Sequence, residues 1–534
     1  MIEKIRIQGY RIYRDVTFTP NPKLNLIVGA NECGKSTLIE AMMLCLTCRI
    51  NGRWASEELN PYWFNTQLTA SFRKSRQAGT PAAWPEIKIE LFLSDRAELQ
   101  HLSGAHNTDL PTRACPGISL TVAPDPEYTG ELEAWATDTP SHLLPVEFFE
   151  VDWRSFADHR LTNRPKDLVT ALIDSRTVRS SSGVDYHMRE ILRDQLEPTE
   201  RATVSLAYRE VKAAMSGGAL KAINERMAKD HEALHGRPIG LAMDQTARTS
   251  WEGAVTPHVE DVPFSMSGQG QQAAIKISLA MRRHSDRASF VMIEEPENHL
   301  SFATLGVLLG RMEALAGDHQ QLFVTTHSSF VLNRLGIDAV HLISDGQYSK
   351  FSGLSEETVR YFQKLPGYDT LRMVLADRIV LVEGPSDEII FERSFFDLHE
   401  CRPLQAGVDV LSVRGLSFAR CLELCDALGK TVAVVRDNDG FDPEDLRAEL
   451  DCWLEDGTRR AFIGSPEKGS TLEPQLIHCN GVDTVRAMLG ISDQADVEKW
   501  MARQKTEAAM RLAAFEGTVV APDYIKEAAA FIHG

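Results

Sequence analysis

Acidic side chains end two apolar runs in the carboxyl-terminal third of the sequence. The run RIVLVEG ends on Glu383, and VAVVRDNDG ends on Asp437 and Asp439. Such apolar, β-branched runs are typical of parallel strands, whose carboxyl ends form the site of an α/β sheet. Right-handed crossovers would bring these acids together, with Asp387 one helical turn beyond Glu383. Clustered carboxylates repel one another unless a cation lies among them, so this set predicts ligands for Mg²⁺ or Mn²⁺.

A second chemistry is indicated near the amino end. An expected strand, residues 24–28, leads directly into GANECGKST and then into the helical run LIEAMMLCL. This order predicts a loop that wraps phosphates with backbone N–H groups at a helix amino terminus. Lys35 would reach the β and γ phosphates, and Ser36 would hold Mg²⁺. The expected ATP contacts are Asn31, Gly34, Lys35, Ser36 and Thr37.

An apolar strand that ends on two acids completes a nucleotide-hydrolysing pattern. The strand SFVMI, residues 289–293, is followed by Glu294 and Glu295. The first acid would orient Mg²⁺ through water and the second would polarise the attacking water. A further expected strand, residues 321–326, ends on His327, which could sense the γ phosphate.

A glycine-rich turn before this strand is suited to a further phosphate. The turn SGQGQQ begins at Ser267 and opens an expected helix over residues 273–282. Its candidate phosphate contacts are Ser267, Gly268 and Gly270.

Four motifs are now in place: the phosphate loop, the glycine-rich turn, the paired acids and His327. Their spacing and order resemble those of the ABC-type ATPases of the RecF and SMC kind. That resemblance implies that the signature turn of one protomer closes the ATP site of another. The chain departs from the usual pattern in having Glu294 as its first acid and one extra residue in the turn. The sequence EEPENHL is nevertheless what ATPases of the OLD (overcoming lysogenization defect) family carry.

The acids described first resemble the Toprim domain of topoisomerases, primases and OLD-family nucleases, in which they handle metal for phosphodiester chemistry. The resemblance also picks out Glu473, in the run TLE, and Lys505, in QKTEAAMRL. Lys505 would neutralise charge in the transition state. In topoisomerases the same acids serve a tyrosine nucleophile. Tyr361, Tyr368 and Tyr524 have no surrounding breakage domain, so hydrolysis is favoured here.

Composition limits the class of protein. At 534 residues, with 43% hydrophobic and 25% charged residues, the chain is long enough for two or three globular domains. No apolar run reaches the roughly 18 residues that span a membrane, and the amino end is not a signal peptide, so a cytoplasmic protein is expected. The net charge of −18 disfavours a protein that coats nucleic acid without specificity, but it does not exclude a nuclease.

The domain organisation follows from these motifs. We expect an α/β fold with an ABC/SMC-like ATPase domain from residues 1–160 and 250–370 and a Rossmann-like Toprim domain with a parallel sheet from 371–534. Residues 160–250 are charged, with leucines and alanines at helical intervals in LVTALIDSR, MREILRDQL and SLAYREVKAAM. They predict a compact helical insertion, a candidate dimer contact, which is too short and interrupted for a long coiled coil.

The function expected from this resemblance is an ATP-regulated, metal-dependent endonuclease acting on DNA, in bacterial antiphage defence. Glu383, Asp387, Asp437, Asp439, Glu473 and Lys505 would form its nuclease site, and Glu295 would serve ATP hydrolysis. One alternative is a ribonuclease, for example on tRNA, since Toprim units can cleave RNA and no residue here reads a 2′-hydroxyl or a base edge, which would distinguish the two substrates. Another is a RecF-like repair ATPase whose Toprim fold is not catalytic. Expected partners are a nucleic acid, further copies of the chain and an accessory defence protein or RNA.

Overall fold

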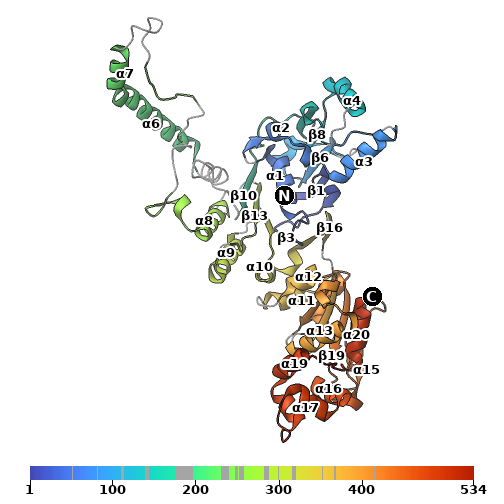
Figure 1. Ribbon diagram of the computed structural model, residues 1–534. Helices are drawn as coiled ribbons and strands as arrows, with labels where there is room; N and C mark the ends of the chain where they lie inside the picture. The colour runs from blue at the N-terminus through green and yellow to red at the C-terminus, as the bar shows by residue number, and fades with distance from the viewer. Residues whose placement is uncertain are drawn as a thin grey trace. The chain divides into compact units, whose positions relative to one another are not determined.

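The protein is seen here in a computed structural model that describes residues 1–50, 52–80, 82–109, 114–138, 143–174, 196–229, 240–246, 251, 258–281, 288–298, 300–315, 320–344, 346–350, 353–365, 369–413 and 417–534. The chain forms two compact units. The amino-terminal unit contains Met1–Thr326 and Ile343–Tyr348, and the carboxyl-terminal unit contains His327–Leu342 and Ser349–Gly534 (Figure 1). The boundary expected near residue 370 therefore lies within the second unit.

The first sheet of the amino-terminal unit is antiparallel. Its six strands lie in the order β2-β1-β6-β8-β7, with β9 also paired to β8. They are β1 (Ile2–Tyr10), β2 (Tyr13–Phe18), β6 (Ile87–Leu93), β7 (Ser103–Gly104), β8 (Cys115–Pro124) and β9 (Phe149–Ser155). Residues 146–148 form a 3-10 turn, and β9 begins directly after it at Phe149.

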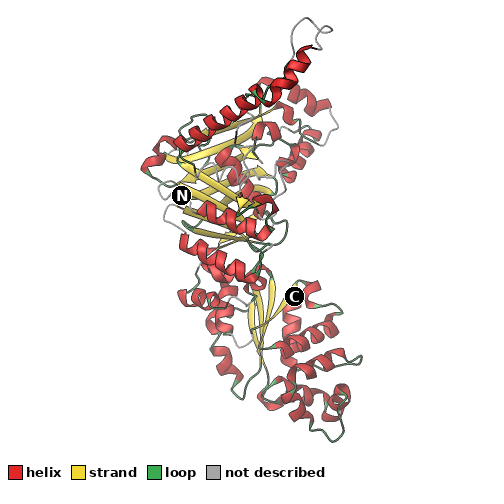
Figure 2. Ribbon diagram, turned by 90° about the vertical axis from the view of Figure 1, so that its left-hand side faces the viewer, coloured by secondary structure: helices red, strands yellow, loops and turns green. Residues whose placement is uncertain are grey.

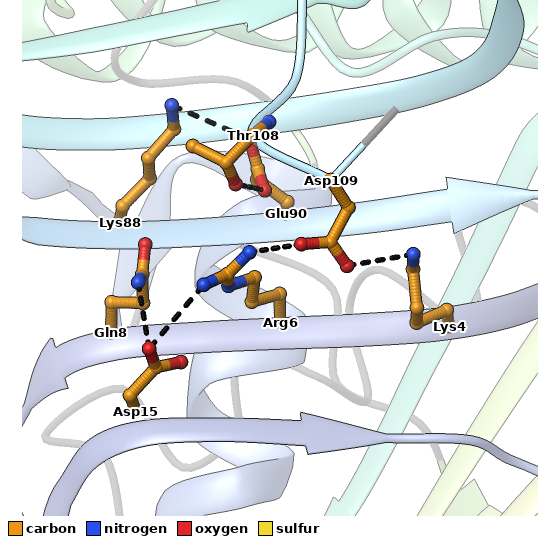
Figure 3. A network of polar contacts seen from close by, with 8 residues as sticks. All are labelled: Lys4, Arg6, Gln8, Asp15, Lys88, Glu90, Thr108 and Asp109. Atoms are coloured by element: carbon orange, nitrogen blue, oxygen red, sulfur yellow. Dashed lines mark hydrogen bonds and ion pairs between the residues drawn. The ribbon is translucent and has the colours of Figure 1, made fainter. Parts of the chain in front are cut away.

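The two faces of this sheet differ because successive side chains alternate along a strand. Ile5 and Ile7 enter the hydrophobic core with helix α1 (Lys35–Thr47). The alternate side chains of β1 and β6 carry charge and bond to β2 and to the loop after β7 (Figure 3). These polar residues are Lys4, Arg6, Gln8, Asp15, Lys88, Glu90, Thr108 and Asp109. Since the network pairs both signs of charge, this face is not a free basic surface.

The second sheet lies in the order β10-β13-β14-β3-β15-β16, and its first four strands are parallel. They are β3 (Leu24–Val28), β10 (Leu168–Asp174), β13 (Ala288–Glu294), β14 (Gln320–Thr325), β15 (Val340–Ser344) and β16 (Gln347–Lys350). The helix expected over LVTALIDSR is therefore wrong, since its first seven residues are β10. Leucines and alanines at helical intervals also occur in a strand that is buried on both faces. The parallel pairing with β13 shows that this segment is a strand and not a helix.

Helices complete the amino-terminal unit. They are α1, α2 (Ala55–Glu58), α3 (Thr66–Gln77), α4 (Thr129–Asp138), α6 (Pro198–Gly217), α7 (Ala219–Lys229), α8 (Gln269–Met281) and α9 (Phe302–Leu315), with the short hairpins β4–β5 (Arg49–Ile50 and Arg53–Trp54) and β11–β12 (His258–Val259 and Val262–Pro263). Helices α6 and α7 agree with the expected helical insertion, whereas the segment MREILRDQL lies outside the described residues. None of the helices within the described residues is long and apolar enough to cross a bilayer.

The carboxyl-terminal unit is built on a parallel sheet of four strands in the order β18-β17-β19-β20. These strands are β17 (Arg378–Val382), β18 (Val408–Ser412), β19 (Thr431–Arg436) and β20 (Arg459–Ile463). Helices lie on either side of the sheet (Figure 2). The α/β class and the parallel carboxyl-terminal sheet expected from the sequence are confirmed.

Two helices cover one face of this sheet, α13 (Pro385–His399) and α20 (Asp523–His533). Val380 and Val382 join their hydrophobic core, and the intervening β17 residues, which are also buried, point to the opposite face. The other helices of the unit are α10 (Ser329–Leu335), α11 (Glu356–Gln363), α12 (Thr370–Leu375), α14 (Phe418–Ala427), α15 (Pro443–Ala448), α16 (Leu472–Asn480), α17 (Val482–Leu489), α18 (Val497–Arg503) and α19 (Lys505–Ala514). Burial on both faces explains why β17 reads as a continuous apolar run.

Candidate active site

The strand order of the carboxyl-terminal sheet creates a topological switch point. The chain passes from β17 to β18 on one side and then returns to β19 on the other side of β17. Ligands of open α/β sheets bind at such a point, beyond the carboxyl ends of the strands. Glu383 follows β17 and Asp437 follows β19, so both acids lie there. Glu383 Oε1 accepts the backbone N–H of Asp437 at 3.2 Å, which fixes the two strand ends together.

The other acids reach this point from helices and a turn. Asp387, in the first turn of α13, accepts the backbone N–H of Gly384 at 3.1 Å. Asp439 is exposed and has a left-handed backbone, with a φ of 50°. The buried Asn438 lies between Asp437 and Asp439. It anchors their loop by donating to the carbonyls of Gly464 at 3.1 Å and Gly469 at 2.8 Å. The loop is therefore held by its middle residue, which leaves Asp439 in solvent.

Glu473 and Lys505 form a pair beside these acids. Glu473 is in the first turn of α16 and is buried, and its Oε2 lies 3.4 Å from Lys505 Nζ at the start of α19. The hydroxyl of Thr471 donates to the same oxygen at 2.9 Å. Lys505 remains half exposed, so its ammonium can face solvent as well as Glu473. Its charge also opposes the rise in the pKa of Asp387.

Three of the clustered acids have raised pKa values. Burial, followed by repulsion from Asp387 and Glu383, raises the pKa of Asp437 to about 8. Burial, followed by Asp439 and Asp387, raises the pKa of Glu383 to about 7, and burial raises that of Asp387 to about 6. A cation among these groups would relieve the repulsion, and their oxygens are the donors that Mg²⁺ and Mn²⁺ prefer.

This set of donors fits a divalent cation in its chemistry. Within the described residues, however, no three His, Cys, Asp or Glu side chains are placed closely enough to hold one metal ion. Mg²⁺ keeps several waters and is commonly bound through one or two carboxylates, so a complete protein shell is not required. The arrangement therefore suits an ion that remains largely hydrated.

The sequence motifs assign no role at this site to two side chains that lie there. Arg436, the last residue of β19, has its Nε 3.8 Å from Glu383 Oε1 and opposes the rise in the pKa of that acid. Its place immediately before Asp437 was a usable signal. The hydroxyl of Tyr524, on α20, donates to Asp437 Oδ1 at 3.3 Å. No local pattern could have connected two residues separated by 87 positions.

The amino-terminal unit places the expected phosphate loop between β3 and α1. Gly34 has a φ of 118°, a conformation that favours glycine. Lys35 is buried and donates to the carbonyls of Gly29 at 3.0 Å and Ala30 at 2.7 Å. The Ser36 hydroxyl donates to Glu294 Oε2 at 2.8 Å. The structure therefore brings Ser36 and the first acid of the following motif together, as a shared Mg²⁺ site requires.

Glu295 has a strained backbone at the end of this motif. Its φ is 46°, and its N–H donates to the Thr325 carbonyl at 2.9 Å. Asn298 Nδ2 donates to Glu295 Oε2 at 2.7 Å, which orients the carboxylate. A non-glycine residue held in this conformation is often part of a functional site.

The remaining expected ATP contacts lie in the phosphate loop, in α1, at the start of α8 and directly after β14. Asn31 is exposed, Thr37 is half buried, and Gly268 and Gly270 flank the first residue of α8. Ser267 makes local bonds, accepting Gln272 Nε2 at 2.8 Å. His327 belongs to the carboxyl-terminal unit. The role of the signature turn therefore remains a prediction.

Comparison with protein families matches three segments of the chain. Residues 374–439 match the "Overcoming lysogenization defect protein-like, TOPRIM domain" model, which contains Glu383, Asp387, Asp437 and Asp439. Residues 4–75 match an "AAA domain" model and residues 253–333 match "AAA domain, putative AbiEii toxin, Type IV TA system". These matches contain the phosphate loop and the paired acids of the amino-terminal unit.

Among curated proteins, the chain is similar to "Endonuclease GajA" of Bacillus cereus (strain VD045), with 22% identity over 232 residues. The alignment covers 41% of this chain and 40% of that protein. Among solved structures, the C-terminal region of the Burkholderia pseudomallei OLD protein matches at 22% identity, with a TM-score of 0.26, covering 30% of this chain and 97% of that one. The SMC head domain from Thermotoga maritima matches at 13% identity, with a TM-score of 0.29, covering 66% and 99%.

Proposed function

We propose that this chain, a member of the OLD family in which an ABC-type ATPase is joined to a Toprim domain, is an ATP-regulated, divalent-metal-dependent endonuclease acting on DNA. One observation carries the proposal. Glu383, Asp387 and Asp437 meet at the switch point of the carboxyl-terminal sheet, where mutual repulsion helps to raise the pKa values of Glu383 and Asp437. The similarity to an endonuclease supports the same activity.

The residues of the carboxyl-terminal unit would divide the work of phosphodiester hydrolysis. Asp437 and Asp439 would hold one Mg²⁺ or Mn²⁺ ion, and Glu383 and Asp387 would hold or approach a second. Such ions can activate water and stabilise a leaving oxygen. Glu473 orients Lys505, whose ammonium can neutralise charge on the phosphate as it is attacked. Asn438 holds the loop that carries Asp437 and Asp439, so both would enter the reaction in fixed positions.

The amino-terminal unit would bind ATP and Mg²⁺. Lys35 and Ser36 would contact the phosphates and the ion, with Glu294 holding Ser36 and Glu295 orienting the attacking water.

Lys35→Ala is expected to lose ATP binding, because its ammonium is the main cation of the loop. Glu295→Ala should bind ATP but hydrolyse it slowly. Nucleotide titration and phosphate release measure the two effects, and unchanged ATP affinity in Lys35→Ala would exclude this site.

We place the activity in bacterial antiphage defence, in the cytoplasm, with further copies of the chain and an accessory protein or RNA as partners.

The deciding experiment is a nicking assay on supercoiled plasmid with Mg²⁺ or Mn²⁺, run beside a tRNA substrate. Asp437→Ala should lose cleavage by about 100-fold or more, since it removes a proposed metal ligand. Glu516→Gln, an exposed carboxylate of the same unit, is the matched control.

The outcomes of this assay separate the candidate functions. Cleavage of plasmid that requires Asp437 supports the proposed endonuclease. Cleavage of tRNA alone would replace DNA with RNA as the substrate. Equal cleavage by Asp437→Ala and the parent would remove the nuclease assignment from this site.

A further inference from the structure

The C-terminal helix α20 brings an unassigned side chain to the acids. Tyr524 lies in its first turn, is 6% exposed, and directs its hydroxyl at Asp437. A buried tyrosine hydroxyl needs a hydrogen-bond partner, and here that partner is a carboxylate proposed to bind metal. The contact joins the last helix of the chain to the end of the central strand β19.

The two oxygens of Asp437 accept hydrogen bonds from two different helices, α20 and α16. Oδ1 accepts the Tyr524 hydroxyl at 3.3 Å, and Oδ2 accepts the backbone N–H of Leu472 at 3.0 Å. Each carboxylate oxygen has a second lone pair, so both remain able to bind a cation. Hydrogen bonds to an ionised carboxylate are stronger than those between neutral groups, which favours one orientation of this side chain.

The position of Tyr524 is itself fixed by packing. Ile525, Ala528 and Ala529 of α20 are fully buried in the core shared with α13 and the sheet. Asp523 bonds to Lys468 and Lys526, which ties the beginning of α20 to the segment before α16. A rigid support of this kind can hold a carboxylate against the repulsion of Glu383 and Asp387.

We infer that Tyr524 is a positioning residue that sets the orientation of Asp437 for binding the divalent cation. The inference rests on the proposed function, because it takes Asp437 as a ligand of that ion. Partners of this kind orient metal ligands, and their loss typically weakens metal affinity or activity by about 10- to 100-fold. The tyrosine does not contact the reacting phosphate in this role.

The test replaces the hydroxyl and leaves the ring. Tyr524→Phe should bind Mn²⁺ about 10- to 100-fold more weakly in calorimetric titration of the full chain. Cleavage should need correspondingly more Mn²⁺, while the rate at saturating ion stays close to that of the parent. Tyr361→Phe is the matched control, since that hydroxyl accepts the N–H of Ser417 at 2.9 Å, away from the acids.

Two further variants make the outcome decisive. Tyr524→His keeps a ring donor and should recover part of the affinity, whereas Tyr524→Leu should not, so the pair answers the question if Tyr524→Phe fails to fold. Unchanged Mn²⁺ affinity in a folded Tyr524→Phe would overturn the inference. Asp437→Asn separates it from the proposed function. If that variant binds Mn²⁺ as well as the parent does, the metal site itself is wrong and not only the role of Tyr524.

Discussion

At the scale of single residues, the acids that serve the proposed chemistry oppose folding. The pKa values of Asp437, Glu383 and Asp387 are raised to about 8, 7 and 6, above those of ordinary carboxyl groups. The folded state therefore keeps protons that the unfolded chain has released. Stability should fall as the pH rises from about 4, where unfolded acids ionise, to about 8, where these folded acids have ionised.

Glu383→Gln tests directly whether ionisation of these acids lowers the stability of the fold. Glutamine removes the charge but keeps the oxygen that accepts the Asp437 N–H. In the presence of EDTA, the variant should melt at a higher temperature than the parent at pH 8.5, and the gain should shrink at pH 5.5. Each kcal/mol recovered corresponds to about 2–4 °C in a domain of this size. Glu516→Gln should show no such dependence, and a gain that is equal at both pH values would contradict the electrostatic cause.

At the scale of helices and strands, the segment after β14 leads from the strands of the proposed ATP site into the unit that carries the proposed nuclease site. It begins with His327, the expected sensor of the γ phosphate, and continues into α10 within the carboxyl-terminal unit. The Ser329 hydroxyl donates to Asp369, which precedes α12, and Arg372 of α12 pairs with Asp409 of β18. A movement of His327 on nucleotide binding would therefore reach the sheet that carries Glu383 through hydrogen-bonded elements.

Asp369→Ala should reduce the effect of ATP on cleavage and leave cleavage without nucleotide unchanged. Asp369 makes the bond between α10 and α12 and is not among the residues proposed to bind ATP or the metal ion. The measurement is the ratio of cleavage rates with and without ATP, and a loss of about 5-fold or more is expected if this bond carries the coupling. Asp445→Ala, another exposed acid of the unit, is the control. An unchanged ratio in Asp369→Ala would exclude this route.

The comparison of sequence with structure is most informative at this scale. β17 and β19 could be predicted because burial on both faces leaves a continuous apolar run. The leucine and alanine spacing in β10 fits a helix as well as a strand, and only the pairing with β13 distinguishes the two structures. The acids at the strand ends could be found from local motifs. Tyr524 could not, since its contact with Asp437 depends on how α20 packs on the sheet.

At the scale of the whole molecule, a surface of α6 bears on assembly. Val204, Val211 and Met215 are exposed on this helix at intervals of seven and four residues, and Tyr208 lies between them. Residues at such intervals share one helix face, so the insertion presents an apolar stripe. This agrees with the proposed dimer contact, which would also allow the turn at Ser267 to meet the ATP site of a second copy.

The protein should therefore be at least a dimer at micromolar concentration, and Val211→Asp with Met215→Asp should shift it toward monomer. Introducing charge into an apolar contact costs desolvation without providing a partner. Light scattering measures the mass with and without ATP. Thr203→Asp, at an exposed polar position of the same helix, should leave the mass unchanged. A parent protein that is monomeric under both conditions would exclude this assembly.

The proposed regulation by ATP depends on the joining of these two units in one chain. Closure of two ATPase units around nucleotide would move the units attached to them, so binding, rather than turnover, should change the rate of cleavage. A ligand shifts such an equilibrium only by its different affinity for the open and closed states. ATP and a non-hydrolysable analogue should therefore change plasmid cleavage in the same direction, by about 5-fold or more. Glu295→Ala, which should bind ATP and hydrolyse it slowly, should retain the effect, and Lys35→Ala should lose it. If ATP and the analogue both leave the rate at its value without nucleotide, while titration shows that they bind, the two units act independently.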